Sequence, residues 1–92
     1  KRTPRKEDAP IDSVLTDWEN VCDDLAEKYR FSARESEIFL LLSRGRDRQY
    51  IHNLLYIAPS TVRTHTYNVY QKMGVHNQQQ LIDIVEAEFS KR

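Results

Sequence analysis

Residues 58–74, APSTVRTHTYNVYQKMG, read as one short helix whose middle carries hydrogen-bonding and aromatic side chains. A face that only keeps a protein soluble is better built from Glu, Lys, Gln and Ala. An apolar line runs along the segment at spacings of four, three and four residues: Val62, Thr66, Val69 and Met73. If this line faces a core, the 3.6-residue period turns a second row outward: Ser60, Arg63, Thr64, Tyr67 and Gln71.

This outward row has the chemistry needed to read base pairs in DNA. Arg63 can form two parallel hydrogen bonds to guanine, Thr64 can contact a thymine methyl group, and Tyr67 can reach a base or a phosphate. Ser60 and Thr61 stand at the start of the helix, where free amides and the helix dipole favour a phosphate. This outward row, the reading row, is therefore predicted to be a surface that recognises DNA.

A second helix must lie close to this row. Asp47 can cap a short helix, and residues 56–58 break the helical pattern before the next helix begins. Arg46 and Arg48, at the start of the short helix, are placed to hold the DNA backbone across the groove. Two helices joined by a short turn, with base-reading groups on the second, indicate a helix-turn-helix.

The sequence offers no comparable pattern for catalysis or for a metal. His52, His65 and His76 have no histidine or carboxylate four residues away, and the chain has no nucleophile elbow and no Gly-rich phosphate loop. Cys22 is the only cysteine, which excludes an internal disulfide and a Cys-rich zinc site and fits a reducing compartment. We predict a protein that is not an enzyme and uses no cofactor and no metal.

The elements that must position these residues are predicted to be five helices in an all-α chain. Residues 1–10 are polar and charged and contain two prolines, so residues 1–11 are expected to be a linker. An amphipathic helix over residues 12–30 follows, then a helix-turn-helix domain over residues 31–89 and a tail over residues 90–92. No alternating strand pattern and no Asn-Gly or Asp-Gly hairpin turn is present.

Within the domain, the expected helices cover residues 33–43, 48–55, 59–73 and 78–89. Ser32 and Glu35 have the spacing of a capping box, and Gly45 and Gly74 stand just past two of the helices, where left-handed backbone is needed. Outside the segment already described, the side chains expected to face the core are Ile38, Phe39, Leu41, Leu42, Ile51, Leu54, Leu55, Leu81, Ile82, Ile84, Val85 and Phe89.

The first helix has an apolar stripe at spacings of three and four: Leu15, Trp18, Cys22, Leu25 and Tyr29. This stripe suits either a two-stranded coiled coil or packing back onto the domain. We favour packing onto the domain, because so short a coiled coil is only marginally stable. The acidic opposite face would repel DNA, so the expected role of this helix is packing or contact with a partner.

The length of the chain and the distribution of its charges limit which classes of function are compatible with the sequence. Ninety-two residues fit one small domain, and no apolar run is long enough to span a membrane. Net charge is zero, but residues 32–77 hold six basic and three acidic residues and all three histidines. A weakly basic centre between acidic flanks is compatible with DNA, although the signal is soft.

Residues 31–85 resemble the LuxR/NarL-type helix-turn-helix domain of bacterial transcription regulators. The matching pieces fall in one ungapped register: FSARESEIF from Phe31, Leu41-Leu42, Gly45, Ile51, LLYI from Leu54, TVRTH from Thr61 and NVYQKMGV from Asn68. The resemblance implies a four-helix domain that reads double-stranded DNA with its third helix in the major groove. It also implies a C-terminal output domain, cytoplasmic, that forms a homodimer on two half-sites about one helical turn apart.

The resemblance also implies roles for individual residues. Arg63, Thr64 and Tyr67 would face bases, with Ser60 as a further candidate. Thr61, His65 and Lys72 would lie near the DNA backbone, in addition to Arg46 and Arg48, whose backbone contacts were predicted above from their position. The fourth helix of the domain would carry the dimer contacts, through Leu81, Ile84 and Val85.

Three positions depart from the family pattern. Ala58 replaces the usual capping residue, Tyr50 stands where Glu is favoured, and His52 stands where Ala is favoured. The reading row also has a single cation, Arg63, so we expect moderate affinity that is sensitive to salt.

Other interpretations of the same residues stay open. Trp18, Tyr29 and the last helix would also suit a helical protein-interaction module without a DNA role. His65 is more simply read as packing against the preceding helix, and Lys72 as complementing the end of its own helix. The chain starts at Lys1 rather than Met, and we read it as a piece of a longer protein with a sensor, receiver or membrane region upstream. The basic residues Lys1, Arg2, Arg5 and Lys6 would fit the cytoplasmic side of a membrane segment.

Overall fold

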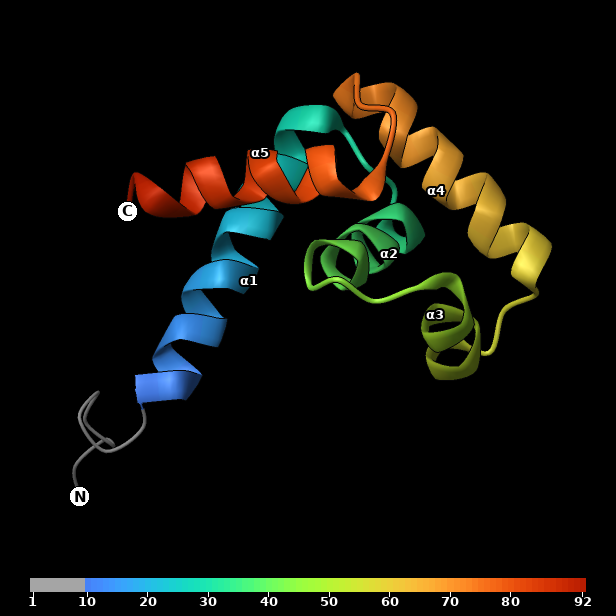
Figure 1. The fold of residues 1–92 in the computed structure, drawn as a ribbon, viewed down its shortest axis with the longest axis horizontal. Coiled ribbons are helices and arrows are strands. Elements are labelled where there is room, and N and C mark those ends of the chain that lie inside the picture. The colour runs from blue at the N-terminus through green and yellow to red at the C-terminus, as the bar shows by residue number, and fades with distance from the viewer. Residues whose placement is uncertain (1–9) are drawn as a thin grey trace.

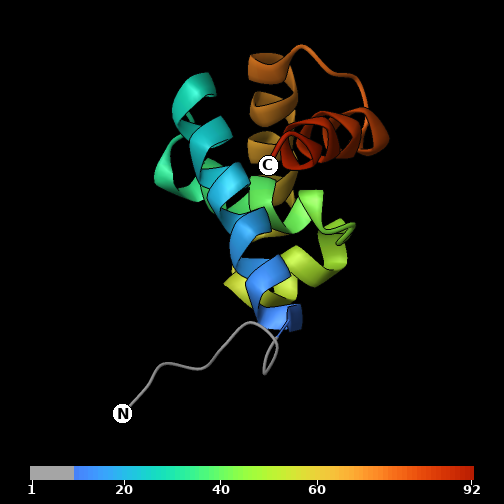
Figure 2. The ribbon, with the colours of Figure 1, turned by 90° about the vertical axis from the view of Figure 1, so that its left-hand side faces the viewer.

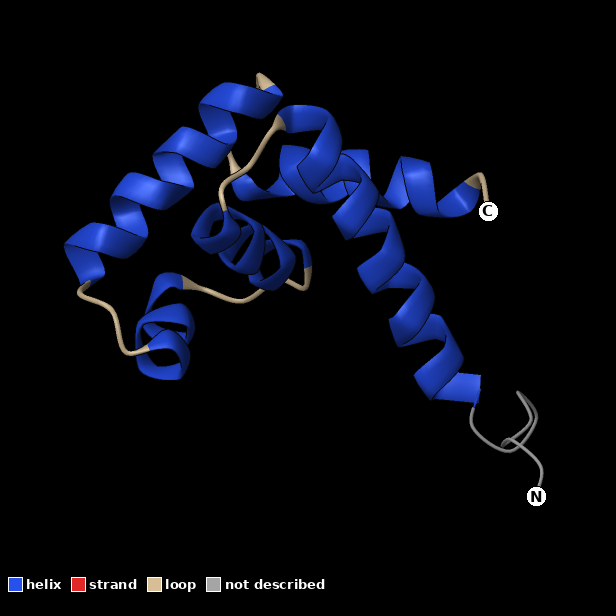
Figure 3. Ribbon diagram, turned by 180° about the vertical axis from the view of Figure 1, so that it is seen from behind, coloured by secondary structure: helices blue, strands red, loops and turns tan. Residues whose placement is uncertain are grey.

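The computed structural model describes residues 10–92, with side chains described from residue 17 onward. It contains the helices α1 (Pro10–Tyr29), α2 (Ala33–Ser43), α3 (Arg48–Leu55), α4 (Pro59–Met73) and α5 (Gln78–Ser90) (Figure 1). Residues 10–92 contain no strand (Figure 3), so the predicted all-α class is confirmed. None of the helices in this range combines the length and the apolar character that crossing a membrane requires.

The helices begin where their sequences satisfy the free amides of a first turn. Ser32 and Glu35 form the predicted capping box: the Glu35 N–H donates to Ser32 Oγ over 3.1 Å, and the Ser32 N–H donates to a Glu35 carboxylate oxygen over 2.9 Å. The Asp47 carboxylate accepts from the Tyr50 N–H over 2.9 Å, as its predicted capping role requires. Asn77 caps α5 in the same manner, through the Gln80 N–H.

The helices also end where expected. Gly45 and Gly74 follow α2 and α4 with φ angles of 82° and 72°, the left-handed conformation that glycine adopts without strain. α3 ends differently, because Tyr56 itself takes the left-handed conformation, with φ of 57°. The turn between α3 and α4 therefore begins on a non-glycine residue.

The core forms around α2, which contacts α1, α4 and α5 (Figure 1). The fully enclosed side chains are Val21, Ile38, Phe39, Ile51, Val62, Val69, Leu81 and Val85. Val62, Val69 and Met73 bury one face of α4, as their spacing predicts. α3 packs on α4, and these two helices lie at the end of the molecule opposite to the C-terminus (Figures 1 and 3).

α1 packs on its own domain, against α2 and α5, as favoured over a coiled coil (Figure 2). The Trp18 ring lies 5.3 Å from the ring of Phe89, and its indole N–H donates to Ser43 Oγ over 3.0 Å. Cys22 Sγ is 3.4 Å from the same hydroxyl oxygen, and burial raises the pKa of its thiol. The polar edge of α1 is held by Arg44, which pairs with Glu19 over 2.8 Å.

Two expectations about the elements were wrong. α1 begins at Pro10 instead of residue 12, because proline suits the first turn of a helix; the rest of the predicted linker and the four basic residues at its start lie outside the described residues. Leu54 was expected in the core, but its exposed fraction is 50 %. The eight-residue α3 buries a narrow stripe centred on Ile51, and Leu54 lies beside that stripe.

Candidate nucleic-acid interface

The outer face of α4 carries the predicted reading row. Ser60, Arg63 and Thr64 are exposed, and 61 % of Tyr67 is accessible to solvent. The opposite face is anchored by Val62 and Val69, which are completely buried. The Thr64 hydroxyl donates to the Ser60 carbonyl oxygen over 3.1 Å, so its methyl group is left for an apolar contact.

The start of α4 is open to a ligand. Ala58 provides no side-chain cap, and Pro59 occupies the first helical position, where its fixed φ favours the helix. The partial positive charge of this helix end is therefore not neutralised by a capping carboxylate. Thr61, one turn in, is half-buried.

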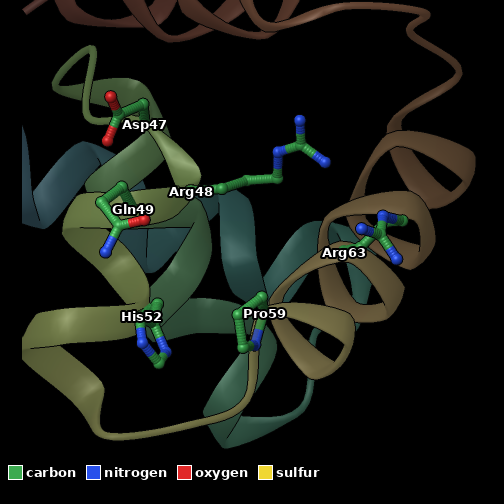
Figure 4. A pocket seen from close by; sticks show the side chains of 6 residues that line it. All are labelled: Asp47, Arg48, Gln49, His52, Pro59 and Arg63. Atoms are coloured by element: carbon green, nitrogen blue, oxygen red, sulfur yellow. The ribbon is translucent and has the colours of Figure 1, made fainter.

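Three arginines border the reading row. Arg48 and Arg63 both line a cavity of about 380 Å³ between the starts of α3 and α4 (Figure 4). The same two residues and Arg46 line a second hollow of about 360 Å³, together with Tyr67 and Tyr70. The Arg46 guanidinium lies 4.4 Å from the centre of the Tyr50 ring, a distance suited to a cation–π contact. The structure thus brings the predicted residues Arg46, Arg48, Arg63 and Tyr67 to one surface.

His65 and Lys72 lie on a different flank of α4, toward the start of α2. Lys72 Nζ donates to a Glu35 carboxylate oxygen over 2.7 Å and to the Arg30 carbonyl oxygen over 3.1 Å. Burial alone would raise the pKa of Glu35, but hydrogen bonds from Lys72 and from the Ser32 N–H outweigh it, and the pKa is lowered. His65 is half-buried, and its Nδ1 is buried without a hydrogen-bond partner. The His65 ring is thus partly enclosed within the domain, on the side of α2 and not of the preceding helix α3, against which the alternative interpretation placed it.

The residues predicted to make a dimer are largely inside the domain. Leu81 and Val85 are completely buried, so neither side chain can present a surface to a second chain, and that prediction was wrong for both. They lie on the face of α5 that packs on α1 and α2. Ile84 is half-buried, while Asp83 and Glu86 are exposed.

α3 packs on α4 with both departures, Tyr50 and His52, present. Tyr50 points outward beneath Arg46 and is 39 % exposed. His52 is half-buried, and its Nδ1 lies 2.6 Å from the Ile57 carbonyl oxygen in the turn. Within residues 10–92 no group of His, Cys, Asp and Glu side chains has the arrangement of a metal site.

Gln78, which was not predicted from the sequence, supports the surface that carries the arginines. Its side-chain amide donates to the Leu42 and Arg46 carbonyl oxygens, over 3.0 Å and 2.9 Å, and so holds the segment that carries Arg46. These contacts span more than thirty residues of sequence and depend on how α5 packs, so no local pattern could have identified them. His52 was noted as a departure from the family, but its contact with the turn was not foreseen.

Comparisons with known proteins agree with this geometry. The family described as "Bacterial regulatory proteins, luxR family" matches residues 30–85. The uncharacterised response regulatory protein YgeK of Escherichia coli (strain K12) is 35 % identical over 72 residues, which are 78 % of this chain and 49 % of that protein. The response regulator protein VraR of Staphylococcus aureus is 32 % identical over 83 residues, 89 % of this chain and 40 % of VraR.

The chain therefore spans about half the length or less of these two relatives. No solved structure gave a significant match. The family match covers α2, α3, α4 and the first part of α5, which are the four helices that the resemblance implied, and α1 lies entirely outside it. On the combined strength of the family match, the relatives and the fold, this chain belongs to the luxR family of bacterial regulatory proteins.

Proposed function

We propose that this domain binds double-stranded DNA in a sequence-specific manner, with α4 in the major groove, as the C-terminal output domain of a transcription regulator. The observation that carries the proposal is the outer row of α4, exposed on a rigid helix and bordered by three arginines. A recognition helix needs this combination, because base contacts specify the sequence while phosphate contacts fix the register.

The proposed roles follow from position. Arg63 binds a guanine, Thr64 and Tyr67 contact neighbouring bases, and Ser60 contacts a base or a nearby phosphate. Arg46 and Arg48 hold the backbone on one side of the groove, and Thr61 lies on the other flank of α4. His65 and Lys72 remain candidates for contact with the DNA backbone, ranked below Arg46 and Arg48. The Lys72 ammonium group is already paired with Glu35, and His65 is half-buried.

The intact protein is proposed to be cytoplasmic, where bacterial DNA lies, and to bind two half-sites as a homodimer. The relatives above are response regulators, which supports a signal-receiving region upstream of this domain in the intact protein. A sensor or a membrane segment are the alternative upstream regions. The competing class, a protein-interaction module, has lost its main support. Trp18 packs against Phe89, and Tyr29 stacks on Phe31, so both aromatic side chains are engaged within the domain.

The direct test compares two variants that each lose one arginine. Arg63→Ala should weaken binding to a labelled duplex about tenfold or more, since a bidentate arginine–base contact contributes about 1–3 kcal/mol. Arg92→Ala removes the same charge from the end of α5, where Arg92 pairs with Asp24 far from α4, and should leave affinity nearly unchanged (Figure 1). Equal effects of the two changes would point to nonspecific charge attraction and would contradict the proposal.

Salt provides a second readout in the same experiment. Binding of the unmodified domain should weaken steeply between about 50 and 200 mM salt, because each neutralised phosphate releases a counterion. A folded domain that binds no duplex at the lower salt, even when two copies are linked, would argue against a DNA role.

A further inference from the structure

His52 is held in one tautomer by the turn between α3 and α4. Its Nδ1 lies 2.6 Å from the Ile57 carbonyl oxygen, and a carbonyl oxygen can only accept a hydrogen bond. Nδ1 must therefore carry a proton in this contact. The neutral ring has a single N–H, so Nε2 of neutral His52 is an acceptor and becomes a donor only when the ring is protonated.

The same residue lines the cavity between the starts of α3 and α4. Six residues form this cavity of about 380 Å³: Asp47, Arg48, Gln49, His52, Pro59 and Arg63 (Figure 4). Because Nδ1 is held by Ile57, Nε2 is the ring nitrogen that can serve a ligand in the cavity. Arg48 extends from α3 toward α4, where Arg63 lies, so guanidinium groups from two helices border the same space (Figure 4).

The charges around the cavity favour an anion. From α3 it is lined by the cation Arg48 and the anion Asp47, and from α4 by the cation Arg63. The Asp47 carboxylate accepts the Tyr50 N–H over 2.9 Å in capping α3, which offsets part of its charge. Gln49 adds an amide that can donate a hydrogen bond, although it also contacts Asn53.

We propose that this cavity binds one phosphodiester group of the DNA backbone, and that protonated His52 donates to it through Nε2. The inference rests on the proposed DNA-binding function and adds a specific phosphate site to it. It also assigns a role to the histidine that stands where the family favours alanine. Neutral His52 would present a lone pair to the phosphate oxygen and repel it, whereas the imidazolium ion would attract it.

Proton uptake and DNA binding are therefore linked. A phosphate that favours the imidazolium form makes protonation easier, and by reciprocity protonation strengthens phosphate binding. Affinity should rise as the pH falls from 7.5 to 6.0, by about three- to tenfold per half-site, since one linked proton changes the binding constant at most about tenfold per pH unit.

The first test follows the histidine itself. In NMR spectra of the three imidazole rings recorded at one fixed pH between 6.0 and 7.5, a saturating duplex should move the His52 ring signals toward those of the imidazolium form. His76 is exposed beyond the end of α4 and serves as the internal control. Unchanged His52 ring signals in a saturated complex would overturn the inference.

The second test uses His52→Asn, whose side-chain amide can keep the contact with Ile57 but cannot be protonated. Its duplex affinity should lose most of the pH dependence between 7.5 and 6.0, while His76→Gln should keep it. Circular dichroism confirms that each variant remains folded. If the domain binds DNA but His52→Asn follows the same pH curve as the unmodified protein, only the phosphate site is refuted. If no duplex is bound at any pH, the proposed function and this inference both fail.

Discussion

At the scale of single residues, Glu35 has two structural roles. Its carboxylate closes the capping box of α2 and also pairs with Lys72 of α4, so one buried anion joins the start of α2 to the end of the proposed recognition helix. The side chain of Glu35 is 8 % exposed and that of Lys72 is 38 % exposed. We infer that this pair fixes the position of α4 and does not simply complement the end of that helix.

Removing one partner should therefore destabilise the domain. Lys72→Met leaves the Glu35 carboxylate buried without its counterion, and we expect a loss of about 1–2 kcal/mol in the free energy of unfolding, a value reduced by the partial exposure of Lys72. Glu37 provides the control, because its pair with Arg34 is exposed on the same helix and Glu37→Gln should change stability by less than about 0.5 kcal/mol. Urea unfolding measures both; equal effects would show that the Lys72 pair has no special role.

The same carboxylate predicts a pH dependence of stability. The pKa of Glu35 is lowered in the folded protein, so its contribution is present above the pKa of the unfolded chain and is lost as the pH falls through the folded value. The unmodified domain should lose stability between about pH 5 and pH 3, and Glu35→Gln should lose less over this interval. Unfolding curves at several pH values test this; parallel losses in the two proteins would assign the effect to other carboxylates.

The roles of single residues were the least predictable part of the sequence. Local devices were predicted correctly, such as the Ser32 capping box and the left-handed Gly74, because each depends on residues within a few positions. The partners of Lys72 and Gln78 lie more than thirty residues away, and their contacts exist only after α4 and α5 have packed. Periodicity also could not separate Leu54, on the edge of the α3 stripe, from Ile51 at its centre.

At the scale of elements, α1 behaves as part of the domain. The whole of α1 lies outside the family match, yet Val21 is completely buried and Leu25 nearly so. Trp18 connects it to α2 through Ser43 and to α5 through Phe89. The stripe in the sequence predicted that α1 would bury one face, and the short length of the helix favoured its own domain as the partner.

Trp18→Ala should consequently lower the free energy of unfolding by about 2–3 kcal/mol, somewhat less than for a fully buried tryptophan, because the ring is only partly enclosed. Trp18→Phe should recover part of the loss, since it retains an aromatic ring against Phe89 but not the bond to Ser43. Because Trp18 contacts α2 and α5 through Ser43 and Phe89, on the side of the domain away from the reading row, the affinity of the folded fraction for DNA should not change. A variant that keeps its stability but loses DNA binding would instead assign α1 a direct role in the complex.

At the scale of the whole molecule, the basic side chains near the reading row and the acidic side chains of α1 lie on different helices. Arg46, Arg48 and Arg63 line one hollow at α3 and α4, while α1 carries acidic side chains such as Glu19 and Asp23. Among the described residues, the end formed by α3 and α4 is therefore the one suited to approach DNA. The net charge of the whole sequence could not show this distribution, although the excess of basic residues in residues 32–77 suggested it.

The same separation bears on oligomerisation. With Leu81 and Val85 inside the core, the exposed positions of α5 include Gln79, Asp83 and Glu86, which are polar. Polar surfaces of this kind associate weakly, because little apolar area leaves water when they meet. We expect the isolated domain to sediment as a monomer at micromolar concentration, and dimerisation to depend on DNA or on the upstream region.

Linking two copies should then restore tight binding. A flexible tether raises the effective concentration of the second domain to about the millimolar range, which can increase avidity by about 10²–10⁴ without any new contact. The gain should be largest on a duplex whose two half-sites are about 10 base pairs apart, where both recognition helices meet the same side of the DNA, and much smaller at about 15 base pairs. Equal affinity at the two spacings would mean that the copies bind independently of helical phase, and the two-half-site arrangement would be refuted while single-site DNA binding stood.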